Sequence, residues 1–229
     1  MPRGNVVQQQ EEWTSRGAYT PDQAARLLRI EPRMVVRWLY GNRHAAALIP
    51  EIPFHQGELI TFLDLVQAMA VRRIRIAKKI SLQKIRAAVD CAREKGVLFP
   101  FARQHVAYVF RGEVVLRLND GTIIEVTGKY KNQQLSEPIV YEYMDDLGFD
   151  DHGLANIYRP LKAGFREVRL SPHLNWGAPT IFPSRYTVAT LVDAYNAEGG
   201  YRGAANICNV NEQDVRLAVQ YEKSLARCA

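Results

Sequence analysis

Residues 19–41 read YTPDQAARLLRIEPRMVVRWLYG, and our interpretation of the fold starts from this stretch. Thr20, Pro21 and Asp22 supply a capping hydroxyl, a proline at the first helical position and an early acid, which together mark a helix start. Pro32 disfavours helical geometry at the residue before it and suits the opening of another helix. The stretch therefore predicts two short helices joined by a tight turn, the second running to residue 40.

The second predicted helix has one apolar and one basic face. Val35, Trp38 and Leu39 are expected to face inward, whereas Arg33 and Arg37 are four residues apart and share the outward face. Guanidinium groups bind phosphates or the edge of guanine in a major groove. The residues that we expect to contact DNA are Tyr19, Thr20, Arg33, Met34, Arg37 and Arg43. An ordinary helical hairpin with a solvated basic face is the alternative.

Net charge favours a polyanionic partner for one half of the chain. Residues 1–97 hold 16 Lys and Arg against 9 Asp and Glu, whereas residues 98–229 hold 14 against 15, so the whole excess of +6 comes from the N-terminal part. Each Lys or Arg near a phosphate releases counterions and thereby adds affinity. This asymmetry agrees with DNA binding by the N-terminal part.

The remaining pattern predicts an α+β chain that is mainly α. Residues 42–59 are expected to form a loop or wing, and helices are expected at 61–79 and 81–94. Alternating residues predict strands at 106–110, 114–118 and 123–126. A further strand is expected at 166–170, with three helices at 187–196, 201–207 and 211–225. Five regions follow: a flexible arm (1–17), a winged helix-turn-helix domain (18–97), an antiparallel β meander (98–136), an acidic linker (137–165) and a C-terminal three-helix, helix-turn-helix-like domain (166–229).

Residues 19–41 resemble the helix-turn-helix of excisionase and MerR-type proteins, through the aromatic-Thr-Pro opening, the pair Ala24 and Ala25, the turn hydrophobe Ile30 and the Arg37-Trp38 step. The stretch VRRIRIAKKISLQKIR (71–86) resembles the helix pair that follows in MerR-type proteins. The resemblance implies a DNA-binding unit over residues 18–97. It departs at the wing, because residues 55–60 lack the usual aromatic-Arg pair.

Residues 166–225 are similar to a small antitoxin domain of prokaryotic toxin–antitoxin operons, through EVRL (167–170), GAPTI (177–181), RYTV (185–188) and VNEQDVRLAVQY (210–221). The order of both units resembles VapB-type antitoxins, which pair with PIN-domain ribonuclease toxins. That resemblance implies an antitoxin that represses its operon and inserts an arginine into the acidic toxin site. The candidates are Arg185, Arg202, Arg216 and Arg227. The alternative is that this unit only packs or dimerises.

No catalytic or metal-binding pattern stands out in the sequence. The three cysteines are far apart, the five histidines are scattered, and the acids of 137–151 suggest a solvated linker. We expect a cytoplasmic homodimer that is not an enzyme, needs no cofactor or metal, and binds operator double-stranded DNA and a PIN-domain toxin but no membrane. A MerR-like regulator with a ligand-responsive middle domain is the second hypothesis, and an undetected nucleic-acid enzyme is the third.

Overall fold

The computed structural model describes residues 17–43, 46–49, 59–77, 79–104, 106–110, 113–118, 122–126 and 145–226. Outside these ranges lie most of the predicted arm (1–17), most of the predicted wing, residues 127–136 of the predicted meander region and residues 137–144 of the predicted linker. α-Helices and small antiparallel sheets make up the described part, in agreement with the expected α+β class. No helix in these ranges has both the length and the apolar character that crossing a bilayer requires.

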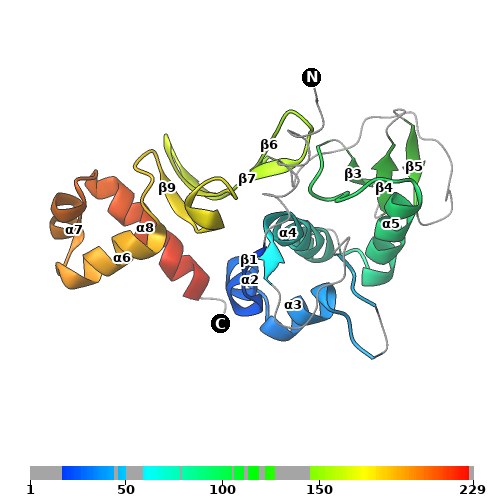
Figure 1. Ribbon diagram of the computed structural model, residues 1–229, viewed down its shortest axis with the longest axis horizontal. Helices are drawn as coiled ribbons and strands as arrows, with labels where there is room; N and C mark the ends of the chain where they lie inside the picture. The colour runs from blue at the N-terminus through cyan, green and yellow to red at the C-terminus, as the bar shows by residue number, and fades with distance from the viewer. Residues whose placement is uncertain are drawn as a thin grey trace, which may run out of the picture.

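The N-terminal part packs around one buried helix. Its helices are α2 (Pro21–Leu28), α3 (Pro32–Leu39), α4 (Phe62–Ala77) and α5 (Leu82–Glu94), and a short ribbon pairs β1 (Gly17–Tyr19) with β2 (Ile60–Thr61). Residues 62–71 of α4 are buried on every face, because α2, α3 and the ribbon pack around it. Figure 1 shows α4 at the centre of this arrangement. The helix expected at residues 61–79 is therefore a core element over most of its length.

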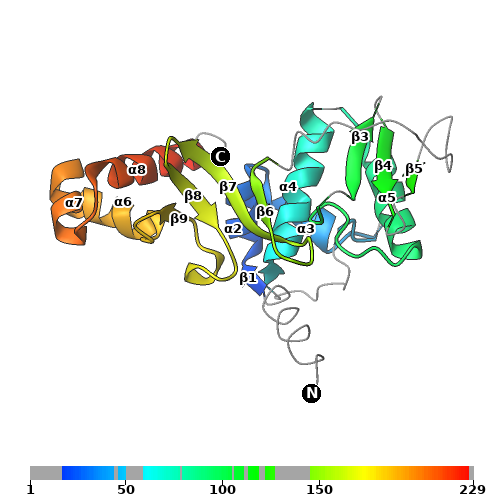
Figure 2. The ribbon, with the colours of Figure 1, turned by 90° about the horizontal axis from the view of Figure 1, so that it is seen from above.

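The middle part is a three-stranded meander, as predicted. β3 (Ala107–Phe110), β4 (Glu113–Arg117) and β5 (Ile123–Glu125) pair in that order, each antiparallel to the next. α5 packs against β4, and Val114, Val115 and Leu116 are buried on that strand. The meander thus shares its core with the N-terminal helices and lies at one end of the molecule (Figure 2).

The C-terminal part combines a four-stranded sheet with three helices. The strands β6 (Leu147–Phe149), β7 (Ala155–Ala163), β8 (Arg166–Leu170) and β9 (Thr180–Phe182) pair in sequence order, and the short 3-10 helix η1 (Asn175–Gly177) lies between the last two. The helices α6 (Val188–Ala197), α7 (Tyr201–Cys208) and α8 (Glu212–Ala226) follow, with α8 packed on β8 and β9. Figure 2 shows these helices at the opposite end from the meander.

This sheet corrects two sequence expectations. Residues 147–163 were expected to belong to an acidic linker, but they form β6 and β7, and the predicted boundary at residue 166 cuts the sheet between β7 and β8. The nine-residue β7 was not predicted because it contains Pro160, and proline is unusual inside a strand. The pairing of β7 with β8 shifts register between Tyr158 and Leu161, and this shift accommodates the proline. β7 also contacts α4, so the second sheet packs on the N-terminal core.

Candidate nucleic-acid interface

The start of α2 is fixed by a reciprocal capping box. The backbone N–H of Gln23 donates to Thr20 Oγ1 at 3.2 Å, and the backbone N–H of Thr20 donates to Gln23 Oε1 at 2.9 Å. Pro21 occupies the first turn, where a missing N–H costs nothing. Thr20 therefore sits where the sequence placed it, exposed at the N-terminus of a short helix.

A left-handed residue makes the turn between α2 and α3. Arg29 has φ 53° and ψ 48°, and the N–H of Ile30 donates to the carbonyl of Ala25 at 3.1 Å. Ala24 and Ala25 are buried, so small side chains line the inner side of α2 where the next helix approaches. The turn thereby holds α3 at a fixed angle to α2.

The faces of α3 divide as the sequence predicts. Val35, Trp38 and Leu39 are all at most 2% exposed. The carbonyl of Trp38 also accepts a hydrogen bond of 2.7 Å from the N–H of Leu48, which ties the end of the helix to the following segment. The inward face of α3 is therefore anchored in the core.

That opposite face is basic and exposed. The side chain of Arg33 is 83% exposed and forms an ion pair with Glu31, while Arg37 is also exposed and Val36 lies between them at 42% exposure. Ion pairs between exposed side chains contribute little free energy, so a phosphate or a base can displace Glu31 from Arg33. Arg43 is exposed beyond the end of α3. The structure thus brings Arg33 and Arg37 to one surface.

Tyr19 and Met34 differ from the expectation. Met34 is half-buried and packs against the core. Tyr19 is 3% exposed, and its hydroxyl donates to the carbonyl of Gly177 at 2.9 Å. Burial, and to a lesser extent the neighbouring phenol of Tyr221, raises the pKa of Tyr19. The predicted contact of Tyr19 with phosphate is therefore corrected: β1 is paired with β2, which turns the ring into the protein.

The C-terminal helices repeat the local geometry of this turn. Asn209 ends α7 with φ 50° and ψ 50°, and the N–H of Val210 donates to the carbonyl of Ala205 at 3.0 Å. Ala204, Ala205 and Val215 are buried, as their counterparts in α2 and α3 are. In contrast to α3, α8 is long and packs against α6, β8 and β9. The turn between α7 and α8 thus has the same geometry as the turn between α2 and α3, but the helix that follows it, α8, is covered by more of the protein than α3 is.

The arginines predicted to reach a toxin lie in different places. Arg202 is exposed on α7, Arg185 is exposed in the turn before α6, and Arg227 lies outside the described residues. Arg216 on α8 forms an ion pair with Glu212 and lies 4.2 Å from the ring centroid of Tyr201. Arg202 and Arg216 therefore belong to one helical hairpin, which Arg185 only adjoins.

Two acids of the expected linker, Asp146 and Asp150, have structural partners. Asp146 forms ion pairs with Arg73 and Lys162. Asp150 accepts hydrogen bonds of 2.9 Å from the backbone N–H groups of His152 and Leu154, which closes the turn after β6. Within the described ranges, no three His, Cys, Asp or Glu side chains gather as they would around a metal ion.

Sequence reasoning missed the seam between the N-terminal and C-terminal parts. Arg26 forms an ion pair with Glu222, and Arg29 donates to Ser224 Oγ at 2.8 Å, so α2 is tied to α8. Arg73 on α4 and Asp146 before β6 join the same two parts. These partners are far apart in the chain, and no local pattern signals their pairing.

The chain is similar to a known protein in its fold but not in its sequence. No protein-family model matches the chain, and no curated protein sequence matches it. Among solved structures, the crystal structure of Rv2018 from Mycobacterium tuberculosis is similar, with a TM-score of 0.63 over 89% of this chain and 97% of that chain. The two sequences are 17% identical, so the likeness concerns the fold alone.

Proposed function

We propose that the chain is a DNA-binding repressor that serves as the antitoxin of a type II toxin–antitoxin module. One observation carries the DNA-binding half: α3 exposes Arg33 and Arg37 on one face while its other face is anchored in the core. In this proposal α2 and α3 act as the helix-turn-helix of a winged domain, and α3 enters the major groove of the operator.

The dimensions of α3 suit this role. Eight residues span about 12 Å along the helix axis, and residues four apart are separated by about 6 Å. Two guanidinium groups at that separation can reach neighbouring base edges or a base and a phosphate. Thr20, exposed at the N-terminus of α2, is suited to a phosphate contact, because helix N-termini favour anions. Arg43 extends the same surface.

The toxin-binding half of the proposal concerns α7 and α8. An acidic, metal-dependent ribonuclease site attracts a guanidinium, which binds carboxylates through charge-assisted hydrogen bonds. Among the described residues Arg202 has no hydrogen-bond or ion-pair partner, whereas Arg216 already engages Glu212 and Tyr201. Ile207 on the same hairpin is 68% exposed and offers a separate apolar contact. We therefore rank Arg202 above Arg216 for insertion into a PIN-domain toxin.

Two-fold operators are read by dimers, so the proposal includes a homodimer. The second hypothesis, a MerR-like regulator, places ligand binding in the middle domain. The cavity described below lies elsewhere, between α2, α4, β7 and α8. The basic face of α3 suits both hypotheses, and the exposed Arg202 of α7 is the observation on which we retain the antitoxin proposal.

Two experiments test the proposal. The first measures binding of the purified chain to the DNA upstream of its own coding region, by fluorescence anisotropy over a range of salt concentrations. The second co-expresses the chain with the product of the adjacent reading frame and asks whether the two co-purify. Absence of specific DNA binding would contradict the repressor half. Absence of any PIN-like neighbour or co-purifying partner would contradict the antitoxin half.

A further inference from the structure

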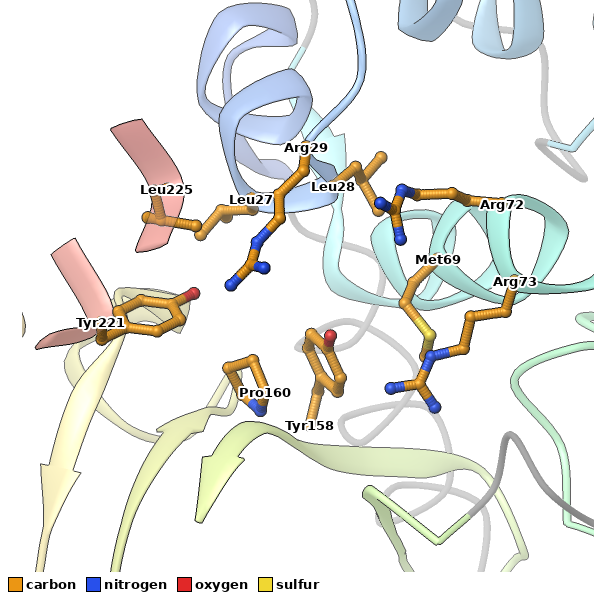
Figure 3. A pocket seen from close by; sticks show the side chains of 10 residues that line it. All are labelled: Leu27, Leu28, Arg29, Met69, Arg72, Arg73, Tyr158, Pro160, Tyr221 and Leu225. Carbon is orange, nitrogen blue, oxygen red and sulfur yellow. The ribbon is translucent and has the colours of Figure 1, made fainter. Parts of the chain in front are cut away.

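A cavity of about 140 Å³ lies at the seam, where α2, α4, β7 and α8 meet (Figure 3). Three arginines line it: Arg29 from the end of α2, and Arg72 and Arg73 from α4. The other lining residues are apolar or tyrosine, and none is Asp or Glu. The cavity therefore gathers positive charge without an acid in its wall.

The three guanidinium groups are not equally compensated. Arg73 forms an ion pair with Asp146. Arg29 donates to the neutral hydroxyl of Ser224, and the Nε atom of Arg72 is buried with no hydrogen-bond partner among the described residues. Buried donors without partners are rare, since each loses its hydrogen bonds to water without replacement, and the penalty is larger when the donor is charged. An unpartnered cationic donor beside a cavity points to a ligand that completes it.

Two tyrosine hydroxyls add neutral donors. Tyr158 on β7 and Tyr221 on α8 line the cavity, and Figure 3 shows the hydroxyl of Tyr221 turned toward the guanidinium of Arg29. Burial raises the pKa of both phenols, so both remain protonated at neutral pH. Protonated phenols can donate to an anion, and they add no negative charge that would repel it.

We propose that this seam cavity binds a small oxyanion, a phosphate or a carboxylate, held by Arg29 and Arg72 with Tyr158 and Tyr221 as further donors. The size agrees, because a cavity of about 150 Å³ holds a molecule as large as benzene. The Nε atom of Arg72 is buried, and burial strengthens a charge-assisted hydrogen bond from this atom to an anion. Anion binding here does not require that the chain bind DNA or a toxin.

A bound anion would bridge the N-terminal and C-terminal parts of the chain. Arg29 is the left-handed residue between α2 and α3, Arg72 belongs to the central helix, and Tyr221 belongs to α8. A ligand that contacts all three binds the folded state and not the unfolded chain, so it raises the midpoint of thermal unfolding as its concentration rises.

The test is isothermal titration calorimetry of the whole chain with inorganic phosphate in one arm and malonate in the other, at constant ionic strength set with sodium chloride. We expect saturable binding of one anion per chain in at least one arm, and the stronger arm identifies the ligand class. Arg72→Met should weaken that binding about tenfold or more, since it removes a charge-assisted hydrogen bond. Lys223→Met, which removes an exposed positive charge from α8, is the matched control and should leave the affinity within about twofold.

Tyr158→Phe keeps the shape of the wall and removes one donor, so it tests the site even if Arg72→Met fails to fold; a loss of about fivefold or more is expected. Lack of saturable binding in both arms would overturn the proposal. So would an unchanged affinity in every folded cavity variant, or an equal loss in Lys223→Met.

Discussion

The hydroxyl of Tyr19 donates a 2.9 Å hydrogen bond to the carbonyl of Gly177, and so joins β1 to η1 across 158 positions of the chain. Gly177 has φ +83°, and a Cβ at this position would overlap the Tyr19 hydroxyl. The pair thus requires a tyrosine on one side and a glycine on the other.

Gly177→Ala should destabilise the protein through both the overlap and the positive φ. We expect a loss of about 2 kcal/mol or more in the free energy of unfolding, measured by urea denaturation. Gly164→Ala is the matched control, because Gly164 has φ +61° and nothing within 4 Å of the added Cβ. Gly164→Ala should lower the free energy of unfolding by about 1 kcal/mol, because only the positive φ opposes the added side chain. Tyr19→Phe should reduce the penalty of Gly177→Ala in a double-mutant cycle, and additive losses would contradict the contact.

Alkaline pH should unfold the protein through its buried phenols. Burial raises the pKa of Tyr19 and of Tyr221 above the ordinary value near 10. The unfolded chain releases these protons near pH 10 while the folded chain retains them, so stability is unaffected below about pH 10 and falls as the pH rises further. Each group contributes a slope of up to about 1.4 kcal/mol per pH unit.

Tyr19→Phe and Tyr221→Phe should each lower this slope, measured by urea denaturation at a series of alkaline pH values. Tyr186→Phe, which removes a phenol that is 37% exposed, is the control and should leave the slope unchanged. A slope that stays the same in all three variants would show that burial of these phenols does not govern alkaline stability.

The two faces of α3 should respond differently to truncation. Trp38 is 2% exposed, so Trp38→Ala removes a large core side chain and should cost about 3–5 kcal/mol of unfolding free energy. Val36 is 42% exposed, and Val36→Ala should change the free energy of unfolding by about 0.5 kcal/mol or less. Chemical denaturation measures both, and comparable losses would contradict the assignment of the buried face.

Toxin binding should depend on Arg202 more than on Arg216. Arg202→Ala is expected to weaken the complex with the co-expressed toxin about tenfold or more, the value of one charge-assisted hydrogen bond. Arg216→Ala removes a side chain that already engages Glu212 and Tyr201, so its effect should be smaller. Surface plasmon resonance gives both affinities. Undiminished affinity in Arg202→Ala would remove this residue from the proposal.

The helices and strands that could be predicted are those with short-range signals in the sequence. Capping residues, prolines and apolar spacing placed α2, α3, α5 and the three C-terminal helices close to their observed bounds, and alternation with tight turns placed the meander. The outward position of Arg33 and Arg37 followed from helical periodicity alone.

Long-range pairing explains what could not. β7 contains Pro160 and was obscured by the acids that precede it; one of these, Asp146, is paired with Arg73 of α4 and with Lys162 of β7 itself. Tyr19 was expected at the surface because its partner, Gly177, is remote in the chain. The seam cavity depends on four elements that meet only in the folded protein.

The central claim is that α3 reads operator DNA through Arg33 and Arg37. Its most direct test is the affinity of Arg33→Ala and Arg37→Ala for the DNA upstream of the coding region, measured by fluorescence anisotropy beside Lys223→Ala as a control of equal charge. Each arginine variant should lose about 1–3 kcal/mol of binding free energy, or about 5- to 150-fold in affinity, while the control stays close to wild type. Wild-type affinity in both arginine variants, or the same loss in all three proteins, would contradict the claim.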